Sequence, residues 1–180
     1  MLFDHYTFVP PTTVDPAAFF ELVDRNRAYL KQGFPYTIKA CADLETTKAF
    51  IRRTNHIQQR KKGYHFYIID TNTNELIGFI NIKNINRNIP MCELGYFIDE
   101  QFQGKGIITK AVGVIVKFCF EQMEMSKIFI CTDPSNLASQ KVALKNGFMQ
   151  EGILRNEFKD PEGNVHDVVY FGLLKEDFKS

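Results

Sequence analysis

The fold of this chain is decided by the stretch Gln101-Phe102-Gln103-Gly104-Lys105-Gly106-Ile107-Ile108-Thr109. It follows an apolar run over residues 94–98 and precedes a long amphipathic run that ends near Glu121. Two glycines let the backbone approach a ligand closely, and the first turn of the next helix offers unpaired N–H groups at the positive end of the helix dipole. The stretch therefore predicts a strand–loop–helix unit that holds an anion, which we expect to be a pyrophosphate. Taken alone, the loop is also compatible with an ordinary tight turn into a helix.

Length and composition predict a single domain over residues 1–180. A chain of this size buries roughly 70% of its unfolded surface, which is enough for a full core. The formal net charge of +1 argues against a protein built mainly to bind nucleic acid, because such proteins neutralise phosphates with an excess of Lys and Arg.

The cysteines predict reduced thiols rather than a disulfide framework or a metal site. All four lie in or beside apolar segments at wide spacings: Cys41, Cys92, Cys119 and Cys131. The histidines are not spaced to complete a zinc site with them, so we expect no metal. The first residues show no signal-peptide pattern, and no apolar stretch reaches the ~20 residues needed to cross a membrane. We therefore expect a cytoplasmic protein with no membrane partner.

Apolar periodicity and turn residues predict an α/β domain with a mixed sheet. Asp15 and Pro16 have the composition of a helix start, and Gly147 that of a helix end. Only residues 91–132 fit a strand–helix–strand crossover. We expect helices from Pro16 to about Gly33, from about Asp43 to Lys62, from about Lys105 to Gln122 and from Asn136 to Asn146, with a loop after Gly33, and strands over 6–9, 64–69, 76–85, 91–98, 127–132, 149–158 and 165–174.

Motifs over nearly the whole chain resemble the GNAT superfamily of N-acetyltransferases, and more closely the branch that acetylates the N-terminal alanine or serine of ribosomal proteins. The motifs are Glu93-Leu94-Gly95-Tyr96-Phe97-Ile98, Gln103-Gly104-Lys105-Gly106, Asp133-Pro134-Ser135-Asn136-Leu137-Ala138-Ser139 and Lys145-Asn146-Gly147-Phe148. The resemblance implies a mixed, mostly antiparallel central sheet of about seven strands flanked by four helices. It also implies that the fourth and fifth strands splay apart.

The resemblance implies acetyl-CoA as the co-substrate. Backbone N–H groups would hold its pyrophosphate, at Gln103, Gly104, Lys105, Gly106, Ile107 and Ile108, with Lys105 adding charge. The backbone of Tyr96, Phe97 and Ile98 would pair with the pantetheine arm, and Asn136 would bind an amide of that arm. Asn136 can also act as a helix N-cap, since the cap uses only its side-chain oxygen.

The reaction is attack of a neutral amine on a thioester, and we expect Glu93 to act as its base, directly or through water. Many members of the superfamily protonate the leaving thiolate with a tyrosine whose position is occupied here by Ala143. The resemblance instead assigns this role to Ser139, one helical turn after Asn136 and on the same face. The structural alternatives are a surface carboxylate at Glu93 and a helix serine bonded to its own backbone at Ser139. A covalent route through Cys131 is disfavoured, because no adjacent cation lowers its pKa.

We expect the amine acceptor to be a protein N-terminus. Its pocket would lie between two walls: the N-terminal helices, near Arg25, Asn26, Tyr29, Phe34 and Tyr36, and the C-terminal hairpin. The acidic tip of that hairpin, Asp160 and Glu162, could attract a cation or be simply solvated. Two other functions stay open, a small-amine acetyltransferase acting on a polyamine or an aminoglycoside, and a non-catalytic acetyl-CoA sensor. The resemblance allows a homodimer.

Overall fold

The computed structural model describes residues 1–179, and these form one mixed sheet of eight strands. The strands are β1 (Leu2–Phe3), β2 (Tyr6–Val9), β3 (Tyr64–Asp70), β4 (Glu75–Asn86), β5 (Met91–Ile98), β6 (Lys127–Thr132), β7 (Met149–Lys159) and β8 (Val165–Leu174). Their order across the sheet is β1-β2-β3-β4-β5-β6-β8-β7, and every neighbouring pair is antiparallel except β5 and β6. The mostly antiparallel sheet is confirmed, with the two-residue β1 as the strand that the sequence did not predict.

The parallel strands β5 and β6 pair only over their first halves. The register runs Met91↔Lys127, Cys92↔Ile128 and Glu93↔Phe129, and stops there. Beyond Glu93 the two strands diverge, so the sheet opens toward their carboxyl ends. This is the predicted splay, and it leaves backbone groups of both strands without a neighbouring strand.

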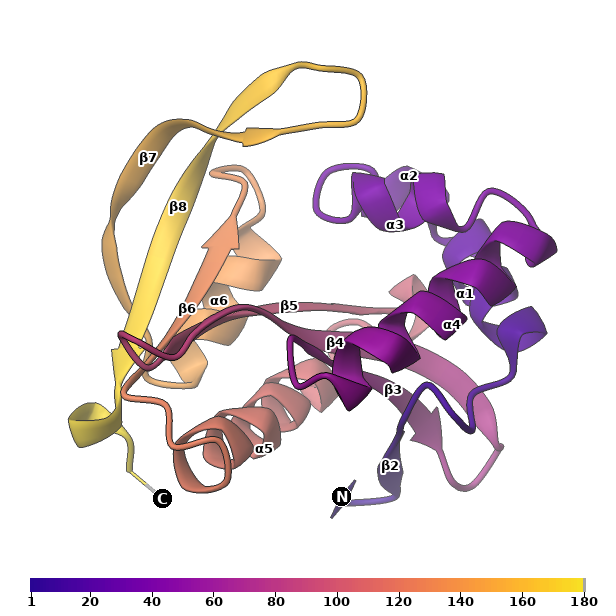
Figure 1. Ribbon diagram of the computed structural model, residues 1–180, viewed down its shortest axis with the longest axis horizontal. Coiled ribbons are helices and arrows are strands. Elements are labelled where there is room, and N and C mark those ends of the chain that lie inside the picture. The colour runs from indigo at the N-terminus through magenta and orange to yellow at the C-terminus, as the bar shows by residue number, and fades with distance from the viewer. Residues whose placement is uncertain (180) are drawn as a thin grey trace.

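Six α-helices cover the two faces of the described sheet (Figure 1). One face carries α1 (Pro16–Arg25), α2 (Arg27–Leu30), α3 (Pro35–Ala40) and α4 (Leu44–Gln59), and the other carries α5 (Ile107–Glu121) and α6 (Leu137–Lys145). Single 3-10 turns lie at Glu100–Phe102 and Lys175–Asp177. Among residues 1–179, no helix combines the length and the apolarity required of a membrane span.

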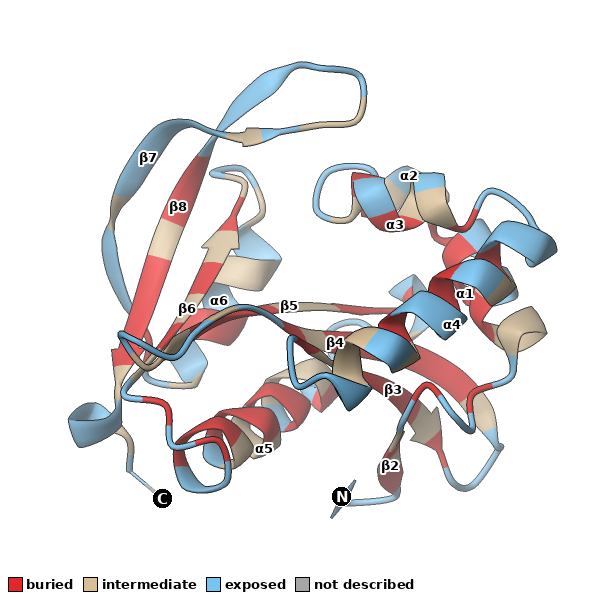
Figure 2. Ribbon diagram, in the orientation of Figure 1, coloured by how far each residue is buried: buried red, intermediate tan, exposed pale blue. Residues whose placement is uncertain are grey.

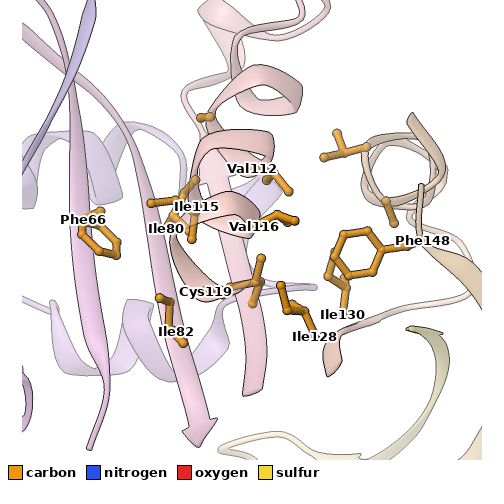
Figure 3. Close-up of a cluster of buried hydrophobic side chains, with 14 of the residues drawn as sticks. Phe66, Ile80, Ile82, Val112, Ile115, Val116, Cys119, Ile128, Ile130 and Phe148 are labelled. Carbon is orange, nitrogen blue, oxygen red and sulfur yellow. The ribbon is translucent and has the colours of Figure 1, made fainter. Parts of the chain in front are cut away.

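The core has two layers, one on each face of the sheet. Between α5 and the sheet, Val112, Ile115 and Val116 pack toward Ile80 and Ile128 (Figure 3). The other layer is aromatic and packs α1 and α4 on β3, β4 and β5 through Phe19, Phe50, Tyr67, Phe79 and Phe97. Burial of these side chains stabilises the central strands, whereas β7 and the tip of its hairpin are largely exposed (Figure 2).

The N-terminal helices differ from the prediction. Instead of one helix from Pro16 to about Gly33, the chain breaks at Asn26, whose amide side chain turns back to donate to the Leu22 carbonyl at 2.8 Å. The expected loop after Gly33 contains α3, because Pro35 occupies the first position of a new helix, where its missing N–H costs nothing. The break and α3 account for the two helices beyond the four expected.

Candidate active site

One cavity of about 870 Å³ occupies the opening between β5 and β6. It extends from Asn136 and Ser139 at the start of α6 to the α2–α3 segment on one side and the β7–β8 hairpin on the other. In Figure 1 these two walls face each other above the sheet. The structure therefore brings Glu93, Tyr96, Asn136 and Ser139 to one hollow, although they come from separate parts of the chain.

The glycine loop (residues 103–106) has the backbone geometry of an anion-binding turn. Gly104 and Gly106 have φ of +75° and +76°, which L side chains rarely adopt. Gly106 is the N-cap of α5 and offers no side chain to its first turn, so the N–H groups from Ile107 onward point out of the helix end. The Lys105 ammonium lies 4.7 Å from the Phe102 ring centroid, above the same loop. A β-carbon on either glycine would meet no other atom within 4 Å, so the loop is open to a ligand.

Arg25 and Asn26 support this loop and do not line the cavity. The Arg25 guanidinium bonds the carboxylate of Asp99 and also that of Glu75, 3.2 Å away. The Asn26 side-chain oxygen accepts from the Glu100 N–H at 3.0 Å. Asp99 is 2% exposed, so the ion pair with Arg25 compensates for its burial. The expectation that these two residues belong to the acceptor wall is therefore replaced by a role in fixing the approach to the glycine loop.

Asn136 caps α6 and positions Ser139 beside Tyr96. The Asn136 side-chain oxygen accepts from the Ser139 N–H at 3.0 Å, which leaves its NH₂ group available to another acceptor. The Tyr96 hydroxyl lies 3.1 Å from the Ser139 carbonyl oxygen and 3.2 Å from its Oγ. Burial raises the pKa of Tyr96 far above its ordinary value, so this phenol keeps its proton. When Tyr96 donates that proton to the carbonyl, the hydroxyl proton of Ser139 is free to donate into the cavity.

Glu93 is buried and paired. One carboxylate oxygen lies 2.9 Å from the Lys83 ammonium, and the other accepts from the Asn84 amide at 2.6 Å. The residue is 7% exposed, so it is not the surface carboxylate that was the structural alternative. A carboxylate has about four lone-pair sites, so Glu93 can accept a further hydrogen bond from a water molecule in the cavity.

Cys131 lines the same cavity but is poorly suited to nucleophilic chemistry. Burial, reinforced by the charge of Glu93, raises the pKa of its thiol to about 12. The thiolate is the reactive species, so this thiol is inert near neutral pH. The three other cysteines are fully buried, and no group of three potential metal ligands occurs within residues 1–179.

Two hydrogen bonds hold the α2–α3 segment across the opening of the sheet, one to the hairpin and one to the loop between β6 and α6. The exposed Tyr36 donates to the Lys159 carbonyl at 2.7 Å and packs edge-on against Phe158. The Gln32 amide donates to the Ser135 hydroxyl at 2.5 Å. Both bonds span more than 100 positions of the chain, so no local sequence signal could have revealed them. They make the cavity a passage roofed by the α2–α3 segment and the hairpin.

The acceptor wall otherwise contains three of the residues expected there, Tyr29, Phe34 and Tyr36. The hairpin tip also borders the cavity, through Asp160 and Glu162. The Asp160 carboxylate is occupied in holding the turn, since it accepts from the His166 ring and from two backbone N–H groups. The bond from His166, more than any other contact, lowers the pKa of Asp160.

The cavity also has a polar floor that was not predicted, formed by His65 of β3 and Asn81 of β4, which are partners across the sheet. His65 Nδ1 and Asn81 Oδ1 are buried without a hydrogen-bond partner. Burial lowers the pKa of His65 to about 4, and Arg53 adds to this effect, so the ring is neutral near pH 7. The available signal was the position of each residue, two places along its strand from a buried aromatic side chain, Tyr67 for His65 and Phe79 for Asn81.

A sheet that opens beside a glycine loop and a helix start suits a ligand that combines an extended chain with a phosphate group. A family model described as an acetyltransferase (GNAT) domain matches residues 5–149, and the chain belongs to this family of N-acetyltransferases. The family uses acetyl-CoA as the acetyl donor.

Similar proteins acetylate ribosomal proteins. The ribosomal-protein-serine acetyltransferase of Escherichia coli is 28% identical over 136 residues, which cover 76% of this chain and 74% of the other. YdaF of Bacillus subtilis is 36% identical over 104 residues, and the match spans 58% of this chain and 56% of YdaF. Among solved structures, the ribosomal-protein-S5-alanine acetyltransferase of Vibrio fischeri superposes with a TM-score of 0.87 at 25% identity, over 100% of this chain and 98% of the other.

Proposed function

We propose that this N-acetyltransferase acts on the N-terminal amine of a protein, with ribosomal proteins as the class of acceptor. The observation that carries the proposal is the continuous cavity, which leads from Ser139 at the opening of the sheet to the outer rim of both walls. Its volume of about 870 Å³ is near the upper end for small-molecule pockets, which leaves room for several residues of an extended chain end. The similar ribosomal-protein acetyltransferases support the same acceptor.

The charge of the cavity suits an amine. Its lining contains five carboxylates and three lysine or arginine side chains: Glu93, Asp133, Asp160, Glu162 and Asp167 against Lys31, Arg53 and Lys83. A protein N-terminus has a pKa of about 7.7–8, so a substantial fraction is already neutral near pH 7.5. Such an amine needs less help from a base than lysine, whose pKa is about 10.4.

In the proposed binding mode, the glycine loop holds the pyrophosphate of acetyl-CoA with N–H groups from Gln103 to Ile108. The pantetheine arm lies between β5 and β6 and pairs with the backbone of residues 96–98, which has no strand neighbour on that side. The free NH₂ of Asn136 donates to an amide carbonyl of the arm. The thioester then lies near Ser139, at the inner end of the cavity.

The proposed chemistry proceeds by direct attack in a ternary complex. The amine nitrogen forms a bond to the thioester carbonyl carbon, the carbon–sulfur bond breaks, and the electron pair leaves with the sulfur. Ser139 donates its hydroxyl proton to the developing thiolate, with Tyr96 holding the serine in place. The proton released by the amine passes through water to Glu93, which holds it until product release.

A thiol-release assay with acetyl-CoA tests this function. The panel contains peptides beginning with serine or alanine, the same peptides with blocked N-termini, spermidine and an aminoglycoside. We expect turnover with free N-terminal peptides and none with blocked ones, even when these contain lysine. Faster turnover of spermidine or the aminoglycoside would assign a small-amine acceptor, and acetyl-CoA binding without any turnover would assign a sensor.

A further inference from the structure

The polar floor is the feature of the cavity that the proposed chemistry does not use. Within residues 1–179, three buried side-chain polar atoms have no hydrogen-bond partner, namely His65 Nδ1, Tyr67 Oη and Asn81 Oδ1. Two of the three belong to residues that line the cavity, and His65 is 8% exposed. An unpartnered buried polar group destabilises the fold, so two such atoms on cross-strand partners that both line the cavity indicate a partner that comes from outside the chain.

The position of the floor relates it to the reaction centre. His65 pairs with Asn81, and Asn81 pairs in turn with Gly95 of β5, two residues from Glu93. Asn81 Oδ1 lies 2.6 Å from the position that a β-carbon of residue 95 would occupy, so any other residue there would displace the amide. Gly95 therefore lets Asn81 reach over β5, toward the point where β5 and β6 separate.

The charge of the floor limits what it can bind. The His65 ring is neutral, since burial and the nearby Arg53 both disfavour its protonated form. Asn81 has no charge, and Arg53 borders the same cavity. A cationic side chain would have to be desolvated beside Arg53, and an apolar one would leave both orphan atoms unpaired. A neutral group that both donates and accepts hydrogen bonds satisfies the two residues.

We infer that His65 and Asn81 form the subsite for the first side chain of the acceptor and select a hydroxyl group, so that an N-terminal serine or threonine is preferred to alanine. This inference rests on the proposed function. A hydroxyl donates to one unpaired atom and accepts from the other residue's N–H, and its carbon is one bond from the α-carbon that bears the amine. The floor is thus a specificity determinant, separate from the residues that move protons.

The test compares two peptides that differ only in serine or alanine at the first position. We expect the protein to favour serine by about tenfold in kcat/KM, which is the effect of one or two hydrogen bonds. His65→Phe and Asn81→Ala each lower kcat/KM for the serine peptide by about fivefold to tenfold and leave the alanine peptide within about twofold. The exposed His56, outside the cavity, provides the control: His56→Phe keeps the preference.

The thermal midpoint separates recognition from a structural role. Because the replaced atoms have no partner in the protein, His65→Phe and Asn81→Ala leave the midpoint unchanged or raise it. Equal turnover of both peptides, or variants that slow both equally, overturns the inference and leaves the proposed function standing. If neither peptide is acetylated while a small amine is, the proposed function and this inference both fall.

Discussion

The two ends of the proposed active site, the glycine loop outside the cavity and the acceptor end inside it, are built in different ways. The end assigned to the cofactor consists mainly of backbone: positive-φ glycines, the first turn of α5 and the unpaired half of β5. The acceptor end consists of side chains from α2, α3, α4, β3, β4, β7 and β8, and hydrogen bonds from Tyr36 and Gln32 join the α2–α3 segment to the hairpin and to the β6–α6 loop. A site made of backbone groups keeps its geometry through most amino-acid substitutions, whereas a site made of side chains changes its contacts whenever one of those side chains is replaced. One family can therefore keep its acetyl donor while its acceptors diverge.

The strongest test of this contrast replaces a glycine of the backbone-built end. Gly104→Val forces a branched side chain to φ of +75°, which strains the loop without a clash, since nothing lies within 4 Å. We expect acetyl-CoA affinity to fall at least ~100-fold, because the N–H groups are re-aimed, with little change in circular dichroism. Calorimetric titration measures the affinity. Gly152→Val is the control, at an equally open position without positive φ, and unchanged affinity in Gly104→Val would refute the pyrophosphate assignment.

Ser139 lies where the two ends meet, so its replacement should affect chemistry and not donor binding. Ser139→Ala removes the proposed donor to the thiolate, and we expect kcat to fall about 100-fold while the affinity for acetyl-CoA stays within about twofold. Single-turnover kinetics and calorimetry measure the two quantities. Ser126→Ala, which loses a hydroxyl that donates to the Pro90 carbonyl outside the cavity, should behave like the unmodified protein. Full activity in Ser139→Ala would remove this serine from the mechanism.

Replacing Glu93 should give a smaller effect that depends on pH. Glu93→Gln keeps the shape of the side chain but cannot take a proton, so we expect kcat/KM to fall. The fall should be only about tenfold, because an N-terminal amine is partly neutral even without a base. The rise of kcat/KM with pH should then follow the deprotonation of the substrate amine alone, whose pKa is near 8. The control, Glu45→Gln, changes an exposed carboxylate paired with Lys48. A pH profile identical to that of the unmodified protein would show that Glu93 is not the base.

The smallest effect is expected at the roof of the acceptor end. Tyr36→Phe removes the hydrogen bond to the Lys159 carbonyl and keeps the aromatic contact with Phe158. The bond is exposed, so we expect the KM of the peptide to rise only about threefold, with kcat and acetyl-CoA affinity unchanged. Steady-state kinetics with Tyr64→Phe as the control measures this. A loss of acetyl-CoA affinity instead would mean that the two ends are not independent.

Local sequence predicted the backbone geometry of the glycine loop and of the start of α6. Positive φ at Gly104 and Gly106, the Asn136 cap and the placement of Ser139 one turn later all depend on residues within a few positions of one another. The resemblance to a family supplied the splay of β5 and β6. The partners of Glu93, the bridges of Gln32 and Tyr36 and the role of Arg25 were not predicted. The partners of Glu93, Lys83 and Asn84, lie on the neighbouring strand β4, and their contact depends on the register of the β4–β5 pair. The other contacts join residues 74, 103 and 123 positions apart, which only the fold brings together.

The opening between β5 and β6 also bears on how the protein avoids aggregation. Unpaired strand edges attract other strands, and this sheet has two inner edges in addition to the outer ones at β1 and β7. The inner edges line a cavity that is covered by the α2–α3 segment and the hairpin, which are joined by the hydrogen bond from Tyr36 to Lys159. The same cover that borders the acceptor therefore shields the open sheet from pairing with the strands of another protein.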